Sequence, residues 1–328
     1  MFSCYQTGKS EILGTTASNV MYEQAYRLKT ETEANSRSLS QKVQCLLLTM
    51  TCLELVHASN TWVERPDLRK VYELSDLKKE YDITVAQLSL LQLMERQVLN
   101  PNVPSSAQET VAQLVNMKGY ELAISVARRF DIKTTIVIDA LTSDYVNLLR
   151  SLKNDFTGES ETLHFIRLNN PSVREIVSSR PVEQVERLLE ARLVAAERSL
   201  ETACHRTCAF RILSSDVFLP AWLVKSYSLR NWPELVSLYH QLGFLEEASR
   251  LAVEKYSELV RSLEKIAFKR QEEYIPPSRL GVLDKLLMEL KYQVTTDSYW
   301  SNALSDMERV KSNYLKAVRN ADVSVFGL

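Results

Sequence analysis

The sequence is poor in glycine, with only 7 glycines among its 328 residues. Folds with many strands and tight turns need more glycine, because turns often require a positive φ angle. Hydrophobic residues make up 45% of the chain and charged residues 25%, as in an ordinary folded protein. The scarcity of glycine therefore favours helices joined by short connections, and we expect an all-α fold.

The chain also lacks an excess of charge of one sign, since its formal net charge is −1. Its densest basic spots, Arg128-Arg129 and Lys269-Arg270, both have acidic residues close by in the sequence. A protein that binds nucleic acid usually carries a field of one sign on one face. We therefore expect no direct contact with nucleic acid.

The 5 cysteines are odd in number and show no disulfide framework, which indicates a reducing compartment. The first residues, from Met1 to Tyr5, do not resemble a signal peptide. No apolar run approaches the ~20 residues of a transmembrane helix. We expect a protein of the cytosol or the nucleus without a transmembrane segment.

Complete catalytic motifs are missing as well. Neither glycine-rich phosphate-binding pattern is present, and none of the four histidines (His57, His164, His205 and His240) lies in a motif with a nucleophile. Cys204-His205-x2-Cys208 is the most metal-like cluster, because residues four apart share a helix face. A structural zinc ion needs further ligands, and no second pair has a recognisable spacing. We expect no enzyme activity, no cofactor and no metal, with a zinc-dependent enzyme as the alternative.

Helical periodicity and its interruptions divide the chain into four segments. Residues 1–17 show little periodicity and are expected to form a loose lead-in, followed by a helical segment at 18–104. Central helical repeats are expected at 105–215 and a C-terminal helical domain at 216–328. Two stretches are ambiguous: residues 71–77 fit a short strand or a helix, and residues 134–141 are rich in β-branched residues. We expect the second stretch to be helical because both its flanks are.

A weak internal repeat indicates how the helices are arranged. Leu114 to Ala123 and Leu238 to Ala248 both read as a helix, a glycine-aromatic turn and a second helix that starts with a small residue. Gly119 is expected to end its helix in the left-handed conformation that glycine favours. Asn231-Trp232-Pro233 is expected to be a third, degenerate turn of this kind. Such hairpins are typical of helical-repeat arrays, so we expect an irregular α-solenoid of helical hairpins.

One block of this C-terminal part resembles a known family. It comprises Leu219-Pro220-x-Trp222-Leu223-x2-Ser226-Tyr227, then Glu234-Leu235-x2-Leu238-Tyr239, and then Leu245-Glu246-Glu247-Ala248. These residues are similar to a stretch near the C-terminus of the one-hundred-and-sixty-kilodalton nucleoporins of the nuclear pore. Fragments at Met21-Tyr22-Glu23, Leu114 to Ser125 and Ile275-Pro276 resemble the same family in the same order. The resemblance extends from about Val20 to Leu290.

The resemblance implies a scaffold protein of the nuclear pore complex at the nuclear envelope. Members of this family belong to the Y-shaped outer-ring complex, where a helical tail at the hub holds other helical nucleoporins. The implied roles are pore architecture, nucleocytoplasmic transport and messenger RNA export, within a hetero-oligomer. The family's N-terminal β-propeller is not expected in this chain. The alternative, built from the same hairpins, is a vesicle-coat or cytosolic adaptor solenoid.

The last helix carries the predicted partner-binding residues. Trp300, Leu304, Met307 and Tyr314 form an apolar stripe at helical spacing. This stripe is the predicted partner contact of the chain, although its packing on Leu283, Leu286, Leu287 and Leu290 is slightly favoured. Aromatic residues also gather between Trp222 and Tyr256, where an interhelical core is favoured over a second partner surface.

Overall fold

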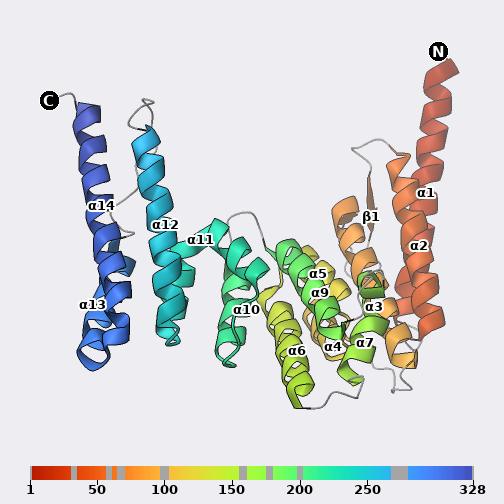
Figure 1. The fold of residues 1–328 in the computed structure, drawn as a ribbon. Coiled ribbons are helices and arrows are strands. Elements are labelled where there is room, and N and C mark those ends of the chain that lie inside the picture. Colours follow the sequence, from red (N-terminus) through yellow and green to blue (C-terminus); the bar gives the residue numbers. More distant parts are fainter. Residues whose placement is uncertain are drawn as a thin grey trace. The chain divides into compact units, whose positions relative to one another are not determined.

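The computed structural model describes residues 2–30, 35–56, 61–64, 71–96, 103–154, 161–174, 180–197, 202–266 and 280–326 (Figure 1). These residues form an irregular, all-α solenoid, as the sequence predicts. The chain divides into two compact units, Met1–Ala196 and Glu197–Leu328. This division does not coincide with the expected boundaries at 104/105 and 215/216. The sequence features at His57, Lys269-Arg270 and Ile275-Pro276 lie outside the described residues.

The first unit consists of eleven elements in the part of the chain that the structure describes. They are α1 (Phe2–Thr30), α2 (Ser36–Glu54), β1 (Trp62–Glu64), β2 (Val71–Glu73), α3 (Leu74–Arg96), α4 (Ala107–Asn116), α5 (Tyr120–Arg129), α6 (Thr135–Asn154), α7 (Glu161–Asn169), α8 (Pro171–Arg174) and α9 (Pro181–Ala196). Because α1 begins at Phe2, residues 2–17 belong to a helix and do not form the expected loose lead-in. Residues 71–77 contain both expected structures, since β2 leads directly into α3. The stretch at 134–141 is helical, as predicted.

The hairpin of α1 and α2 packs on α3 around a shared apolar core. Its buried residues are Tyr22, Ala25, Leu46, Met50, Leu53, Val63 and Leu77. Burying one such leucine stabilises the fold by roughly 1.5–3 kcal/mol. β1 lies against this core and pairs antiparallel with β2, a small hairpin that the sequence did not predict. The two long helices approach closely at Gly14, where an added Cβ atom would come within 2.8 Å of Val56 Cγ2.

The turn between α4 and α5 corrects the role expected for Gly119. Lys118 is the residue with a left-handed backbone (φ 59°), whereas Gly119 has a φ of −87°. The Gly119 N–H donates to Leu114 O (2.8 Å) and the Lys118 N–H to Val115 O (2.9 Å), which is the Schellman arrangement at a helix end. Lysine is held here because its ammonium lies 2.8 Å from Asp144 Oδ2. Tertiary contacts thus hold Lys118 in a left-handed backbone conformation that lysine adopts only rarely on its own.

Two buried asparagines fasten the same turn to the end of α7. The side-chain amide of Asn169 donates to Met117 O, and that of Asn170 donates to Lys118 O at 2.7 Å. The Asn170 amide oxygen in turn accepts from the Glu121 N–H at 3.0 Å, at the start of α5. These bonds satisfy backbone groups that the ends of α4 and α5 would otherwise leave without partners. The sequence repeat therefore marks a turn whose stability comes from residues about 50 positions away.

The second unit contains the C-terminal helices. Its described elements are α10 (Ala203–Leu213), α11 (Ala221–Gln241), α12 (Leu245–Ile266), α13 (Leu280–Thr296), the 3₁₀ helix η3 (Ser298–Trp300) and α14 (Ser301–Phe326). Its most extensive packing is that of α12 against α14. α11 is kinked at Asn231, whose backbone is not helical (φ −154°, ψ 70°). Pro233 lies just after the kink, where its missing N–H is tolerated. Asn231-Trp232-Pro233 thus interrupts the helix as a kink, and it lacks the left-handed residue that the expected third turn of the repeat would have.

The α11–α12 turn uses glycine where the α4–α5 turn uses lysine. Gly243 has a φ of +84°, and the Phe244 N–H donates to Tyr239 O at 2.9 Å. The two repeats therefore share one type of turn, but the glycine occupies a different position in each. In the first repeat it follows the left-handed residue, and in the second repeat it is that residue.

A row of aromatic rings joins three helices of the second unit. Tyr256 on α12 makes T-shaped contacts with Trp232 on α11 (ring centroids 5.1 Å apart) and with Tyr314 on α14 (5.4 Å). Tyr227 and Tyr239 are buried as well. The aromatic residues between Trp222 and Tyr256 thus contribute chiefly to an interhelical core, which was the favoured interpretation. Edge-to-face pairs of this kind contribute roughly 0.5–1.5 kcal/mol beyond the area they bury.

Candidate partner-binding groove

The structure separates the four residues predicted to bind a partner. Met307 is 0% exposed and Tyr314 is 1% exposed, because α12 and α13 both cover this face of α14. These two residues follow the packing alternative, and Leu283, Leu286, Leu287 and Leu290 are buried in the same unit. Trp300 and Leu304 are half-buried. Trp300 therefore remains the main candidate for a contact outside the chain.

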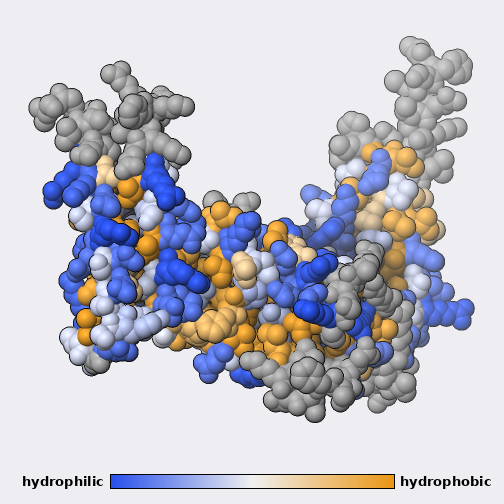
Figure 2. Space-filling view, in the orientation of Figure 1, coloured by the Kyte–Doolittle hydropathy of each residue, from blue (hydrophilic) through white to orange (hydrophobic). Residues whose placement is uncertain are grey.

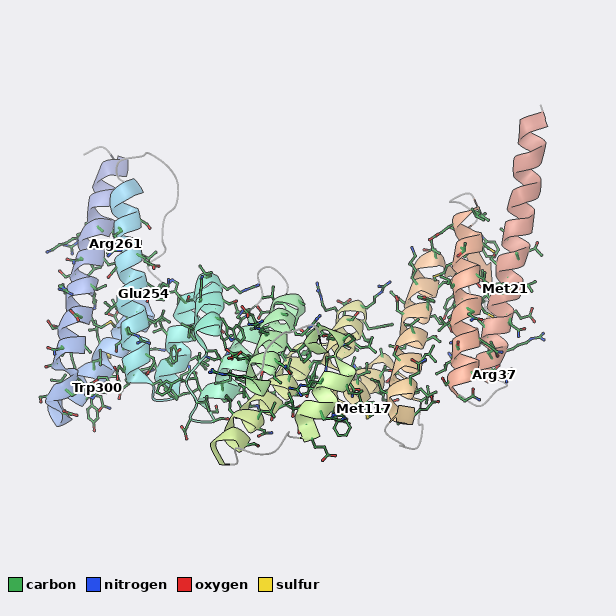
Figure 3. All side chains as sticks on the ribbon, turned by 45° about the vertical axis from the view of Figure 1, so that its right-hand side comes forward. Met21, Arg37, Met117, Glu254, Arg261 and Trp300 are labelled. Carbon is green, nitrogen blue, oxygen red and sulfur yellow. The ribbon has the colours of Figure 1, made fainter. Side chains whose placement is uncertain are left out.

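A groove lies beside Trp300, between the first turns of α12 and the start of α14. It has a volume of about 520 Å³ and is lined by Glu246, Ser249, Arg250, Val253, Ser298, Tyr299, Trp300, Asn302, Ala303 and Asp306. Figure 3 shows Trp300 near the N-terminal end of α12. Glu254 and then Arg261 lie farther along that helix, away from Trp300. Figure 2 shows apolar side chains in a seam between α12 and α14, with hydrophilic side chains on both flanks.

Local turn chemistry places two aromatic rings side by side at this groove. Asp297 caps η3, since its carboxylate accepts a hydrogen bond from the Tyr299 N–H at 2.9 Å. Tyr299 and Trp300 then meet edge to face, with ring centroids 5.4 Å apart and an interplanar angle of 86°. Tyr299 is 62% exposed. Tyrosine and tryptophan supply much of the binding energy at protein interfaces, so the pair is suited to contact another protein.

The charges around the groove are mixed, since Glu246, Asp306 and Arg250 all line it. Asp306 also pairs with Arg309 at 2.7 Å, in an exposed position where such a pair contributes little. An amphipathic helix with apolar and basic side chains would match this combination of aromatic rings and carboxylates. Helical periodicity identified Trp300 but not Tyr299, although Asp297 followed by Ser298 is a signal for a capped turn.

A buried polar cluster in the same unit was not predicted. His205 is fully buried; its backbone N–H donates to Glu197 Oε1 at 2.8 Å, and its Nδ1 contacts Glu197 Oε2. Its Nε2 lies 2.8 Å from the hydroxyl oxygen of Ser226. Arg230 reaches Glu197 Oε2 at 3.5 Å. No sequence motif contains this pair, because only the packing of α10 against α11 brings Ser226 to His205.

The arrangement of Ser226, His205 and Glu197 resembles a catalytic triad, but the surroundings of these residues favour a structural role. Ser226 lies inside α11, where backbone N–H groups bond to carbonyls of the preceding helical turn. A serine hydrolase needs such N–H groups to point at the oxyanion of its substrate. The carboxylate of Glu197 instead caps α10, whose N-cap residue Thr202 makes no side-chain cap bond. The cluster ties the start of α10 to the middle of α11.

The cysteines of the zinc alternative lie next to this cluster. Cys204 and Cys208 are 2% and 0% exposed, and no disulfide joins them to another described residue. Within the described ranges, no group of three or more His, Cys, Asp or Glu side chains is arranged to hold a metal ion. His205 directs its Nδ1 to Glu197 and its Nε2 to Ser226. Across the same ranges, no helix has the length and apolarity needed to cross a bilayer.

Comparison with known proteins identifies the family. The family described as Nup160 C-terminal TPR matches residues 73–325, and the family described as NUP160/120 middle TPR matches residues 4–55. The nuclear pore complex protein Nup160 of Mus musculus and that of Homo sapiens are each 28% identical over 271 residues, covering 73% of this chain. The Nup160 homolog of Drosophila melanogaster is 23% identical over 335 residues, covering 92% of this chain.

These relatives are much longer than the present chain, which matches 18% of the mouse and human proteins and 23% of the fly protein. Both family matches fall on the helical elements described above. The match to residues 4–55 covers most of the α1–α2 hairpin, and the match to residues 73–325 covers the helices from α3 to α14. Since the second match extends over well more than half of the sequence, this chain belongs to the Nup160 C-terminal TPR family.

Proposed function

We propose that this chain is a scaffold nucleoporin that forms a helical part of the hub of the Y-shaped outer-ring complex. Membership of the Nup160 C-terminal TPR family is the observation that carries the proposal. The relatives in mouse, human and fly are all named as nuclear pore complex proteins. Stacked helical hairpins expose long surfaces relative to their volume, which suits a protein that holds several partners.

The proposed location is the nuclear pore complex at the nuclear envelope. There the chain would support pore architecture and, through it, nucleocytoplasmic transport and messenger RNA export. The proposed mechanism is binding without catalysis. Its support is the His205 cluster, whose carboxylate caps a helix and whose serine lies inside another.

The proposed partners are other helical nucleoporins of the Y-complex, in a hetero-oligomer. The groove beside Trp300 is the proposed contact, with Tyr299 as its most exposed aromatic residue. A partner helix would place an apolar side chain against the two rings and a basic side chain near Glu246 and Asp306. Leu304 remains a candidate at the margin of this contact.

Imaging separates this proposal from the alternative of a vesicle-coat or cytosolic adaptor solenoid. The chain fused to a fluorescent protein is expected at the nuclear rim. Cytoplasmic puncta or a diffuse cytosolic signal would instead favour the alternative. Affinity purification from extract is expected to recover other nucleoporins, and recovery of coat proteins would contradict the proposal.

Two tyrosines provide a matched test of the groove. Tyr299 is 62% exposed within the groove, whereas Tyr292 on α13 is 66% exposed and is not one of the groove's lining residues. Tyr299→Ala should reduce recovery of the nucleoporins about tenfold or more, as expected for an interface hot spot. Tyr292→Ala should leave recovery unchanged. Equal recovery by the two variants would exclude the groove as the partner site.

A further inference from the structure

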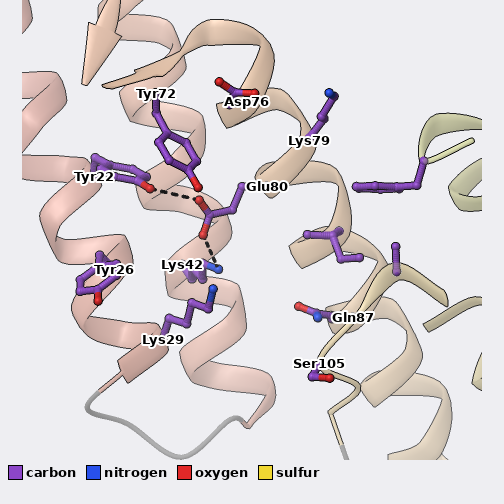
Figure 4. A pocket seen from close by; sticks show the side chains of 13 residues that line it. Tyr22, Tyr26, Lys29, Lys42, Tyr72, Asp76, Lys79, Glu80, Gln87 and Ser105 are labelled. Atoms are coloured by element: carbon purple, nitrogen blue, oxygen red, sulfur yellow. Dashed lines mark hydrogen bonds and ion pairs between the residues drawn. The ribbon is translucent and has the colours of Figure 1, made fainter. Parts of the chain in front are cut away.

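A pocket in the first unit is unrelated to the groove and contains a concentration of lysines and tyrosines (Figure 4). Its volume is about 450 Å³, and it lies among α1, α2, α3 and the start of α4. The lining residues are Tyr22, Tyr26, Lys29, Lys42, Tyr72, Asp76, Lys79, Glu80, Ile83, Gln87, Ser105, Ala107 and Phe130. Three lysines against two carboxylates leave the pocket with an excess of positive charge.

The deepest of these lysines is Lys42, which is 6% exposed. Its ammonium nitrogen lies 3.0 Å from Glu80 Oε1. The other oxygen of Glu80 accepts a hydrogen bond from the Tyr22 hydroxyl at 3.3 Å. An ammonium group has three N–H donors, and Glu80 Oε1 is its one acceptor among the described residues. A buried cation therefore has hydrogen-bonding capacity left for an anion in the pocket.

Lys29 adds a second positive charge next to the first. Figure 4 shows the Lys29 and Lys42 ammonium groups on the same side of the pocket. Burial lowers the pKa of Lys42; Glu80 opposes that shift and the charge of Lys29 adds to it. No ion pair of Lys29 occurs within the described part of the chain. Among the described residues, Glu80 pairs with Lys42 and not with Lys29. The charges of the two lysines oppose each other, and an anion between their ammonium groups would relieve that repulsion.

The aromatic and aliphatic residues that line the rest of the pocket indicate which kind of anion would fit. Tyr22 and Tyr72 stack in a tilted arrangement, with ring centroids 6.0 Å apart. Their rings, with Ile83 and Phe130, give the pocket apolar surface that can contact carbon atoms. A free inorganic ion would leave this surface unused, whereas a side chain that carries an anionic group on an apolar stem would contact both kinds of wall.

We propose that this pocket binds an anionic side chain from a peptide segment of a partner protein, with its acidic group between Lys29 and Lys42. A carboxylate and a phosphate share the chemistry that these ammonium groups recognise. Lys79, which is exposed and also lines the pocket, would contact a further acidic residue of the same segment. The site is distinct from the groove at Trp300 and does not depend on the proposed function.

Fluorescence anisotropy with labelled hexapeptides tests the proposal on the intact chain. The probes are hexaglutamate, a glycine-serine hexapeptide with one central phosphoserine, and hexaglutamine as the neutral reference. Binding of either acidic probe above the hexaglutamine reference is expected, and the tighter of the two identifies the preferred group. Equal binding of all three probes would overturn the proposal.

A matched pair of lysines locates the binding. Lys29→Gln should weaken binding of the tighter acidic probe about tenfold, because it removes one charged hydrogen-bond donor. Lys78→Gln is the control: Lys78 is exposed on α3 next to Lys79, is not part of the pocket, and has an equal charge. The affinity of the Lys78→Gln chain for the same probe should stay within about twofold of that of the unmodified chain, since an exposed charge outside the pocket is screened. Equal weakening by the two substitutions would show general attraction to a lysine-rich surface, and the proposal would then fail. Both variants keep buried residues intact, and circular dichroism verifies their folding.

Discussion

Replacement of Glu197 by alanine is expected to destabilise the second unit strongly. The Glu197 carboxylate accepts from the His205 backbone N–H at 2.8 Å, contacts His205 Nδ1, and lies 3.5 Å from Arg230. Alanine removes all three interactions at once. Because Glu197 and His205 are buried, water cannot readily replace the lost partner.

The magnitude follows from the individual contacts. Loss of a helix cap costs about 1 kcal/mol. A buried ring nitrogen left without its partner costs about 1–3 kcal/mol. The Arg230 pair is long and its side chain is 25% exposed, so it contributes less than about 1 kcal/mol. We therefore expect the free energy of unfolding to fall by about 2–5 kcal/mol, within the range for breaking one side of a buried charged network.

Urea unfolding followed by tryptophan fluorescence measures this change. Trp222, Trp232 and Trp300 lie in the second unit and Trp62 in the first, so the signal reports mainly on the unit that contains Glu197. The unfolding midpoint should fall by about 1–2 M urea. Glu197→Gln should cost less, since its amide oxygen can still accept from the His205 N–H.

The control for this experiment is Glu254→Ala on α12, where the glutamate side chain is 60% exposed and 3.9 Å from Lys255. Its free energy of unfolding should change by less than about 0.5 kcal/mol. If Glu197→Ala also costs less than about 1 kcal/mol, the cluster does not hold α10 against α11 and the structural role argued above is wrong.

Two further predictions concern helix packing and pH. Gly14→Val should destabilise the first unit by about 1–3 kcal/mol in thermal unfolding, because even its Cβ would lie 2.8 Å from Val56 Cγ2. Gly281→Val is the control, since a Cβ there meets no atom within 4 Å, and a similar loss in both variants would refute the close approach at Gly14. Burial, followed by the charge of Glu247, raises the pKa of Tyr239 from 10.0 to about 12. The folded state therefore holds this proton more tightly than the unfolded state, and the associated stability is present below pH 10 and lost as the pH rises from 10 through 12. In urea unfolding, Tyr239 should account for about 1–3 kcal/mol of the free energy of unfolding that the unmodified chain loses over that range, so Tyr239→Phe should lose that much less; an identical loss would assign the pH dependence to other groups.

The helices of this chain are largely predictable because their signals are local. The spacing of apolar residues predicted α14, and the helical flanks of residues 134–141 predicted the start of α6. The left-handed residue at the end of α4 was misassigned to Gly119. Glycine is favoured there by its own backbone freedom, but Lys118 is held there by Asp144 and Asn170. Such distant partners leave no trace in the local pattern.

The candidate site was less predictable, for the same physical reason. The stripe from Trp300 to Tyr314 correctly indicated an apolar face, but periodicity does not specify which helix covers that face. α12 and α13 bury Met307 and Tyr314 and leave Trp300 at the margin. The cluster at His205 joins residues 8 and 21 positions apart on different elements, so no motif revealed it. Likewise, the prolines indicate where helices break. They do not indicate where one unit ends and the next begins, because that boundary depends on how the helices pack.

The aromatic row of the second unit provides an optical probe of its packing. Trp232, Tyr256 and Tyr314 come from three helices and meet at ring distances of 5.1 and 5.4 Å, so their fixed geometry should give a distinct near-ultraviolet circular dichroism signal. Isolated helices that had lost their mutual packing would retain the far-ultraviolet signal and lose the near-ultraviolet one. Spectroscopy of the intact chain can therefore distinguish a correctly packed solenoid from one that is merely helical, without a label or a partner.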